Sequence, residues 1–439
     1  MLTPLENLSK KPAQRRLVIA AAIMRSNGLS REEIGKALKR SPSAVTKLLK
    51  LAEDAGYLSS APTFLRHKVN DADFAEVRRS FFGETDFTEE LRAVVPTPKD
   101  LKVEPKPAVF RFAATVMMGS YPEFIHAAAV HVCHLLRKAQ LLGLMWGRTV
   151  HLLVENIRAC GEHLDHDAFR DIVCVPLCRD PTHLMNERRL EFSASWLAGE
   201  LERALRRPAA YRPANPCLIG VPAYLSRAVR EGAKEDGGSL FKHLHAIPGY
   251  QVILGRDPAR PQRLADKVDS VIMGAGIIGP EYAQWSPERP DFPATGDLIA
   301  ERLLQEEDVR KEDLARLIFG DVGGVLLERP DLGAKDHATV ESLNAGWTGL
   351  KESDLQRIAA AASDKGAGIV LVASSAAKAE VLLAAIQRGL VNRIIVDMSL
   401  KERLVELARA AASKAGAKPA ASAPPQSRRL RKRPRASQS

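Results

Sequence analysis

The sequence has few cysteines, no secretion signal and no long apolar run. Its five cysteines are an odd number with no secretory pattern around them, which argues against a disulfide framework. The first residues, MLTPLENLSKK, lack the apolar core of a signal peptide. No apolar stretch approaches the roughly 20 residues of a membrane-spanning helix. We therefore expect a cytoplasmic protein with reduced thiols and no membrane partner.

Catalytic and metal motifs are also missing. There is no G-x-S-x-G elbow, no H-E-x-x-H pair and no G-x-x-x-x-G-K-[ST] phosphate loop. A zinc site is an open alternative, because several candidate ligands lie close in sequence; they are Cys160, His163, His166, Cys174 and Cys178. They lack two C-x-x-C pairs, and the last two cysteines lie on or just past an apolar stretch, as small core residues do. We expect no metal.

One glycine run spells a dinucleotide fingerprint. Residues 274–279, GAGIIG, follow an apolar strand-like stretch and match G-x-G-x-x-G. The fingerprint requires a helix next, whereas Pro280, Pro287, Pro290 and Pro293 follow and would break one. We therefore expect no nucleotide cofactor.

The excess of positive charge is confined to the two ends of the chain. The net charge is +11, of which residues 1–58 carry +6 and residues 411–439 carry +8. The long middle is therefore slightly acidic, at −3. Residues 413–439 lack periodicity and predict a disordered basic tail, which is a dispensable end, a phosphate anchor for DNA or, as a less favoured alternative, a nuclear-localisation signal. This distribution is typical of a DNA-binding head on a body that binds something else.

Residues 29–58 predict two helices joined by a tight turn. Ser30 with Glu33 forms a capping box, and Ser41 followed by Pro42 is a second helix start. Residues 13–26 predict a supporting first helix, and Gly56 predicts a left-handed cap. The pattern is that of a helix-turn-helix head over residues 1–58, with or without a wing.

The second helix carries small, hydroxyl and basic residues on its polar face. Such a face suits a recognition helix in a DNA major groove, and the candidate DNA-binding residues are Ser41, Ser43, Ala44, Thr46, Lys47 and Lys50. An ordinary helical hairpin with a solvated basic face is the alternative. Lys39 and Arg40 depart from the usual Gly and apolar residue of this turn, so we expect a looser or different turn.

After residue 58 the chain predicts a connector and then an α/β domain. Residues 59–106 carry mixed charge and several prolines, as a connector does. From residue 107 to 412, apolar strands alternate with helices; the expected strands are 140–146, 171–177, 216–221, 268–273, 368–373 and 391–397, with a turn-rich segment at 319–327. Such alternation predicts a doubly wound, mostly parallel sheet, whose ligands bind at the carboxyl ends of the strands.

One strand-to-helix turn has the composition of an anion site. Gly147 lets the backbone approach a ligand, Arg148 could clamp a phosphate or carboxylate, and Thr149 could cap the helix that follows. An ordinary turn with an exposed arginine is the alternative.

The order of motifs resembles the SorC family of bacterial regulators. The head is followed by G-L-x-W-G-x-T, V-P-L, a strand ending in G-x-G, a G-D turn, a strand-turn-helix with a lysine, and R-G-L-V-N-x-x-x-x-D. The resemblance spans roughly residues 17–410. It implies a sugar-binding domain related to sugar-phosphate isomerases and CoA transferases, and transcriptional control by a small sugar or sugar phosphate. It also implies an oligomer, a dimer or a tetramer, on double-stranded DNA.

The resemblance also implies an effector site. Its residues here are Gly147, Arg148, Thr149, Gly274, Gly276, Asp321 and Lys378. Asp321 can accept hydrogen bonds from sugar hydroxyls and Lys378 can hold a phosphate, although a turn-capping Asp and a solvated Lys are alternatives. Two departures remove the family's glycines, at Arg179-Asp180 and at Ser374-Ser375, which suggests a different or smaller effector or a weakened pocket.

The sequence thus predicts a DNA-binding regulator, not an enzyme, that responds to a small sugar or sugar phosphate. Two other functions stay open. An isomerase or transferase on the same sheet would use Asp321 and Lys378 as acid and base. A regulator with a degenerate pocket would work through protein contacts alone.

Overall fold

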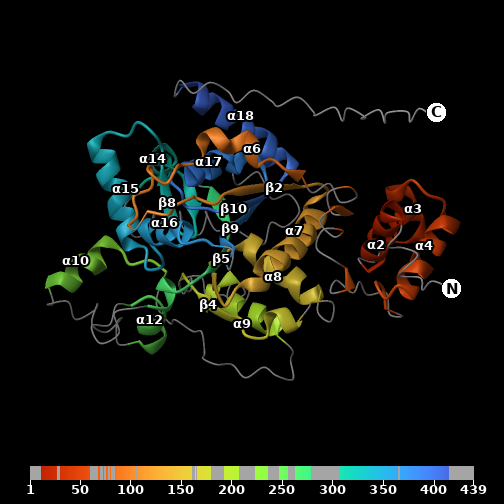
Figure 1. Ribbon diagram of the computed structural model, residues 1–439. Helices are drawn as coiled ribbons and strands as arrows, with labels where there is room; N and C mark the ends of the chain where they lie inside the picture. Colours follow the sequence, from red (N-terminus) through yellow and green to blue (C-terminus); the bar gives the residue numbers. More distant parts are fainter. Residues whose placement is uncertain are drawn as a thin grey trace, which may run out of the picture.

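The protein is described by a computed structural model (Figure 1). It describes residues 11–26, 30–59, 85–104, 106–160, 166–178, 192–206, 223–235, 247–255, 263–277, 309–363 and 366–414, with a few single residues between them. Several predicted segments lie outside this set, namely most of 74–82, all of 216–221 and 297–304, and the tail beyond 414. Residues 60–67, which follow the head, also lie outside it.

The N-terminal head is a bundle of three helices. They are α2 (Pro12–Ser26), α3 (Arg31–Leu38) and α4 (Pro42–Asp54), and Figure 1 places them beside the rest of the molecule. Both predicted helix starts are confirmed: Ser30 and Glu33 form the capping box, and Ser41 caps α4 with Pro42 behind it. The three helices enclose their own apolar core, which includes Ile19, Ile34 and Val45.

The turn between α3 and α4 is tight, and the expectation of a looser turn is wrong. Lys39 adopts the left-handed conformation, with φ 52° and ψ 50°, and so takes the place that glycine usually has. The backbone N–H of Arg40 donates to the Gly35 carbonyl at 2.8 Å. A Cβ on Gly35 would lie 2.7 Å from the Arg40 carbonyl oxygen, so this close turn needs a glycine there. Gly56 has the predicted positive φ, 69°.

The body is built on a seven-stranded sheet of order β1-β2-β10-β9-β5-β3-β4. Its strands are β1 (Thr85–Asp86), β2 (Ala113–Met117), β3 (Leu141–Leu144), β4 (Val173–Pro176), β5 (Ser270–Met273), β9 (Gly368–Ala373) and β10 (Arg393–Asp397). All neighbours pair in parallel except β1 with β2. Since β4 lies on one side of β3 and β5 lies on the other, the strand order reverses between β3 and β5.

Helices cover both faces of this sheet, which confirms the predicted doubly wound α/β class (Figure 1). One face packs on α7 (Tyr121–Leu135), α8 (Arg148–Cys160) and α9 (Ala194–Leu205). The other packs on α16 (Glu352–Ala360), α17 (Ala379–Gln387) and α18 (Met398–Lys414). The inner strands are apolar on both sides because each face meets a helix layer.

A second, antiparallel sheet replaces the predicted turn-rich segment. Its strands are β6 (Ala275–Ile277), β7 (Ile318–Val322) and β8 (Val325–Glu328). A two-glycine turn joins β7 to β8, with φ 58° at Gly323 and 87° at Gly324, the positive values that such hairpins require. Helices α14 (Lys311–Leu317) and α15 (Ala334–Gly346) flank this hairpin, and the sequence analysis did not predict α15.

The predicted connector is wrong over its second half, because residues 85–104 belong to the body. The hydroxyl of Thr88 accepts the Ala114 N–H at 2.9 Å, and Leu91 in α6 (Thr88–Leu91) is buried in the body core. Lys401 of α18 also pairs with Glu90 at 2.9 Å. Pro96 is buried and Pro98 is half-buried, so this stretch is part of the body rather than a linker. No helix among the described residues is long and apolar enough to cross a membrane.

Candidate functional site

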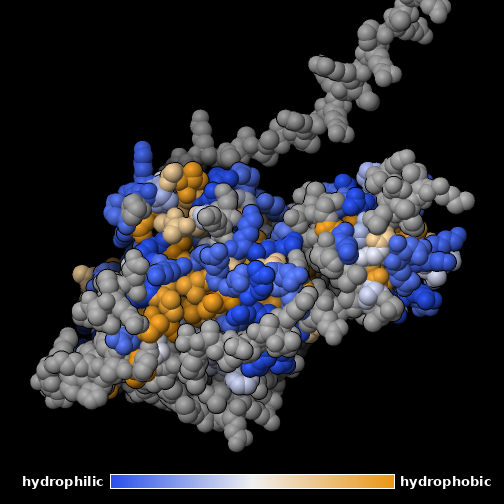
Figure 2. Space-filling view, turned by 60° about the horizontal axis from the view of Figure 1, so that its bottom comes forward, coloured by the Kyte–Doolittle hydropathy of each residue, from blue (hydrophilic) through white to orange (hydrophobic). Residues whose placement is uncertain are grey.

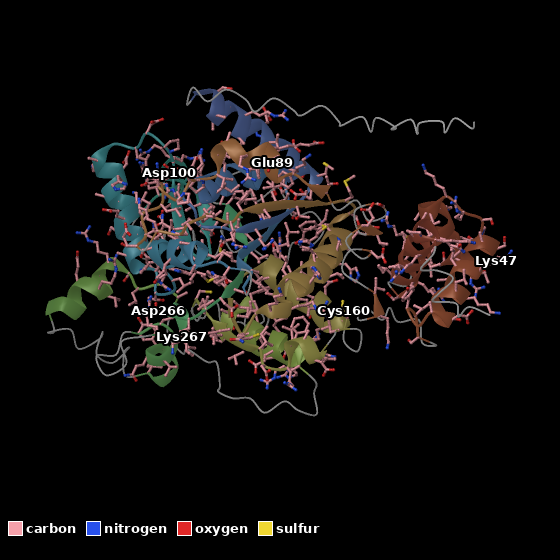
Figure 3. The ribbon with its side chains drawn as sticks, in the orientation of Figure 1. Lys47, Glu89, Asp100, Cys160, Asp266 and Lys267 are labelled. Atoms are coloured by element: carbon pink, nitrogen blue, oxygen red, sulfur yellow. The ribbon has the colours of Figure 1, made fainter. Side chains whose placement is uncertain are left out.

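The polar face of α4 is open to solvent. Val45, Leu48 and Leu49 turn into the head core. The predicted DNA-binding residues Ser41, Ser43, Thr46, Lys47 and Lys50 are exposed, and Ala44 is half-buried. Lys47 lies on the side of the head that faces away from the body (Figure 3). Nothing in the described part of the chain therefore covers this face.

Hydrogen bonds fix the start of α4. The Ser41 hydroxyl accepts the Ala44 N–H at 3.3 Å and lies 3.0 Å from the Ser43 hydroxyl. Thr46 donates its hydroxyl to the Pro42 carbonyl at 3.0 Å. The hydroxyl groups are thus held along the helix rather than free to rotate, with the two lysines one and four positions further on. Such a rigid, cationic helix start can enter a groove lined by phosphates.

The sequence analysis missed one exposed cation next to this face. Arg40 is exposed in the turn just before the cap of α4, and its guanidinium donates to the Lys39 carbonyl at 3.1 Å. Its signal was a basic residue at a position where an apolar one is usual. The visible surface of the head is mostly hydrophilic (Figure 2), in keeping with a polar partner.

The seven predicted effector residues converge on one pocket. It is lined by Gly147, Arg148, Thr149, Gly274, Gly276, Asp321 and Lys378, together with Trp146, Ala275 and Gly323. The pocket lies beyond the carboxyl ends of β3 and β5, where the strand order reverses. Its free space is about 20 Å³, room for one or two water molecules or a single small polar group. As described, it is a narrow polar recess.

The glycine before α8 lets the backbone turn sharply into the pocket wall. Gly147 has a φ of 136°, which side-chain-bearing residues avoid, and its carbonyl accepts the His151 N–H at 2.8 Å. Helix α8 begins at Arg148. Thr149 is buried behind it. The helix start with Arg148 is a favourable place for a negative charge.

Asp321 is a buried carboxylate with one oxygen unused. It lies on β7 and is 3% exposed. Its Oδ2 accepts the Gly324 N–H at 2.9 Å, whereas its Oδ1 has no hydrogen-bond partner among the described residues. Burial raises the pKa of Asp321 to about 6, although the Gly324 N–H and the charge of Lys378 oppose this. The free oxygen is suited to accept a hydrogen bond from a ligand hydroxyl.

Lys378 supplies a buried cation to the same pocket. It ends the short helix η11 (Ala376–Lys378) and is 5% exposed. Burial and then the charge of Arg148 lower its pKa to about 8, while Asp321 and Asp397 oppose the change. Within the described chain no carboxylate is within ion-pair distance of its ammonium group. The positive charges of Lys378 and Arg148 repel one another and both line this pocket. An anion bound there would offset that repulsion.

Strain marks the place where the family's glycines are missing. Ser375 has φ 86° and ψ 129°, a conformation that favours glycine. Its backbone N–H donates to Asp397 Oδ2 at 3.1 Å, and its hydroxyl accepts the Ala377 N–H at 3.4 Å. The loop thus keeps a glycine-like shape without glycine. The sequence analysis missed Asp397, although it closes the R-G-L-V-N-x-x-x-x-D motif. The other departure, Arg179-Asp180, lies outside the described residues.

The metal and dinucleotide alternatives gain no support. No group of three potential metal ligands occurs among the described residues, which do not include His163. The Cys178 thiol instead accepts the Trp146 N–H at 3.1 Å, and Cys174 is buried in β4. Gly276 lies in β6, which pairs with β7, so the glycine run continues as a strand rather than opening a helix at that point.

Comparisons with known proteins found structural likeness only. No protein-family model and no curated protein matches the chain. Among solved structures, the chain is similar to the full-length sorbitol operon regulator SorC from Klebsiella pneumoniae, at 17% identity and TM-score 0.40, covering 89% of this chain and 98% of that one. A DeoR family transcriptional regulator from Listeria monocytogenes has 16% identity and TM-score 0.41, with 67% and 94% covered.

A transcriptional regulator from Streptococcus pneumoniae is also similar, at 12% identity and TM-score 0.43, covering 73% of this chain and 95% of that one. With identities of 12–17% and TM-scores of at most 0.43, these likenesses carry no argument about what this chain does.

Proposed function

We propose that the protein is a cytoplasmic, DNA-binding transcriptional regulator whose operator binding is controlled by a small sugar or sugar phosphate. The exposed face of α4 carries the proposal. A recognition helix with a hydroxyl-rich start and two exposed lysines, held on its own three-helix core, serves double-stranded DNA and has no use in an enzyme. The body would oligomerise as a dimer or tetramer, so that two or more heads meet their half-sites.

The pocket at the strand reversal supports the effector part of the proposal. Lys378 and Arg148 favour a phosphate or carboxylate, and the free Oδ1 of Asp321 favours a hydroxyl donor. A ligand that offers both groups is a phosphorylated or acidic polyol. Such a ligand can change operator binding only if it binds two arrangements of the heads with different affinity.

DNA binding is tested by footprinting the full chain on the region upstream of its own gene. We expect a protected site that Lys47→Ala weakens by about tenfold or more, because one phosphate or base contact is lost. Lys335→Ala is the matched control, since Lys335 is also exposed but lies on α15 of the body. Undiminished binding by the Lys47 variant, with an unaltered footprint, would contradict the assignment of the recognition helix.

The effector part has its own experiment. Thermal-shift screening against phosphorylated sugars should give a saturable rise in the melting temperature that disappears in Lys378→Met, and the same ligand should change the footprint. No response at millimolar concentrations would favour a degenerate pocket and leave the DNA-binding part standing.

One observation keeps an enzyme as the second candidate. The pKa of Asp321 is raised to about 6 and that of Lys378 is lowered to about 8, and both groups line one pocket. Such perturbed pairs are typical of acid–base catalysis, although buried ion networks show them too. Turnover of a sugar phosphate by the purified chain, lost in Asp321→Asn, would favour an isomerase or transferase over a regulator.

A further inference from the structure

A second pocket lies at the opposite edge of the main sheet. Its walls include the first residues of β2 and β10 and the chain just before β9, so it lies at the amino ends of these strands. The effector pocket lies at the carboxyl ends. The second pocket has a volume of about 260 Å³, enough for a small ligand. Arg92, Arg111 and Arg393 line it together with Phe110 and Phe112.

Arg393 has an uncompensated guanidinium in this pocket. The side chain is half-buried, and it makes no hydrogen bond or ion pair with any described residue. Its Nε is shielded from solvent and has no acceptor. Burial and then the charge of Arg111 lower its pKa. A partly buried cation that faces a second cation is costly unless an anion lies between them.

The backbone holds the two arginines next to each other. Ala113 of β2 is the register partner of Arg393, and Arg111, two residues before Ala113, is close enough for its charge to lower the pKa of Arg393. The Asn392 side chain donates to the carbonyls of Arg111 and Ala359, each at 2.9 Å, and accepts the Ile369 N–H at 2.9 Å. The buried Asn392 therefore joins β9, α16 and the chain that leads into β2, beside the two arginines.

Another arginine of the pocket, Arg92, is ion-paired within the body. Arg92 donates to Glu89 at 2.7 Å, so its charge is largely offset. One wall of the pocket is apolar: Phe112 is half-buried, and Val109 is 69% exposed on the rim. The site therefore combines one uncompensated guanidinium, a second arginine and an apolar wall.

We propose that this pocket binds the phosphate group of a small organic ligand, held by Arg393 and Arg111. Two guanidinium groups offer the planar, paired N–H donors that match phosphate oxygens. The apolar wall at Phe112 and Val109 takes the organic part, so an organic phosphate binds more tightly than inorganic phosphate. The chain then has two anion sites, one at each edge of the same sheet.

The test uses the full-length Lys378→Met variant, in which the effector pocket has lost its buried cation. Phenyl phosphate and inorganic phosphate are titrated by calorimetry and by thermal shift at constant ionic strength. We expect saturable binding of both, with phenyl phosphate the tighter. Arg393→Gln should weaken binding about 10- to 100-fold, as expected for the loss of hydrogen bonds to a charged group. Arg170→Gln is the control, because Arg170 is 79% exposed near the amino end of β4.

A second readout needs no ligand. Without phosphate, Arg393→Gln should raise the melting temperature, because it removes a cation that lacks a partner. Two results would overturn the proposal: neither probe binds, or binding survives Arg393→Gln. Equal affinity for the two probes would overturn the organic part of the assignment.

Discussion

The side chains that give the effector pocket its chemistry also cost stability. Asp321 holds a raised pKa because burial disfavours its charge, so the native state keeps a proton that the unfolded chain has already lost. Between the ordinary pKa of 3.8 and about 6, the native state therefore binds more protons. The contribution of Asp321 to stability is most favourable below this window and falls as pH rises through it.

The first prediction is that Asp321→Asn abolishes this pH dependence. Relative to the native chain, the variant should gain roughly 2 kcal/mol of stability as pH rises from about 4.5 to 7.5, since one pKa unit corresponds to about 1.4 kcal/mol. The measurement is denaturant unfolding at several pH values. A constant difference between the two proteins across this range would contradict the assigned burial cost, whatever the absolute stability of the variant.

The second prediction concerns the strained Ser375. Ser375→Gly should stabilise the protein by about 1 kcal/mol, because the relief of a backbone strain of roughly 1–3 kcal/mol exceeds the lost hydroxyl cap and the greater freedom of glycine when unfolded. Ser374→Gly is the matched control: Ser374 is buried beside it but has no positive φ, so only destabilisation is expected. Equal effects of the two substitutions on the unfolding midpoint would rule out strain at Ser375.

At the scale of the element, the β7–β8 hairpin of the small antiparallel sheet forms part of the pocket wall. Gly324 donates its N–H to Asp321, and a Cβ on it would lie 1.8 Å from the Trp347 ring. Trp347 in turn packs against Trp146, with 5.8 Å between ring centroids, and Trp146 lines the pocket. The hairpin therefore fixes the carboxylate and one wall of the pocket at once.

The third prediction is that Gly324→Ala destabilises the protein by roughly 2–4 kcal/mol, through positive φ and overpacking together. The changed surroundings of Trp347 should also shift the tryptophan fluorescence. Gly199→Ala is the control with the opposite sign. Gly199 lies inside α9 with open space around its Cβ position, so alanine should stabilise that helix by about 0.5–1 kcal/mol. A harmless Gly324→Ala would mean that Trp347 has room to move.

Elements with local signals were predictable from the sequence. The caps of α3 and α4 and the apolar strands β9 and β10 depend on neighbouring residues, and their predictions are confirmed. The β7–β8 hairpin was missed because Gly323-Gly324 signals a turn, while its strands are defined only by pairing with β6 and each other. The resemblance predicted that Asp321 and Lys378 share one pocket, and both residues line it. Their shifted pKa values were not predictable, because the shifts come from burial, which depends on the whole fold.

At the scale of the whole molecule, charge is separated between the head, the body and the tail. The body is slightly acidic and the two ends are basic, so the ends are the parts of the chain that a polyanion would attract. The head offers the ordered face of α4, whereas residues 415–439 contribute charge with no sequence pattern. Under the proposed function the two ends should differ in kind: the head should select sequence, and the tail should add affinity that salt screens.

The last prediction separates these two contributions. A chain ending at Lys414 should keep the footprint of the full chain but bind DNA with a shallower dependence of log affinity on log salt. Each phosphate contact that the tail makes should remove about 0.9 from that slope. Lys47→Ala in the full chain should instead weaken the footprint at every salt concentration, with a slope change of at most about one. If the truncated chain kept the full slope, the tail would be a dispensable end, and the ordered head alone would hold the phosphates.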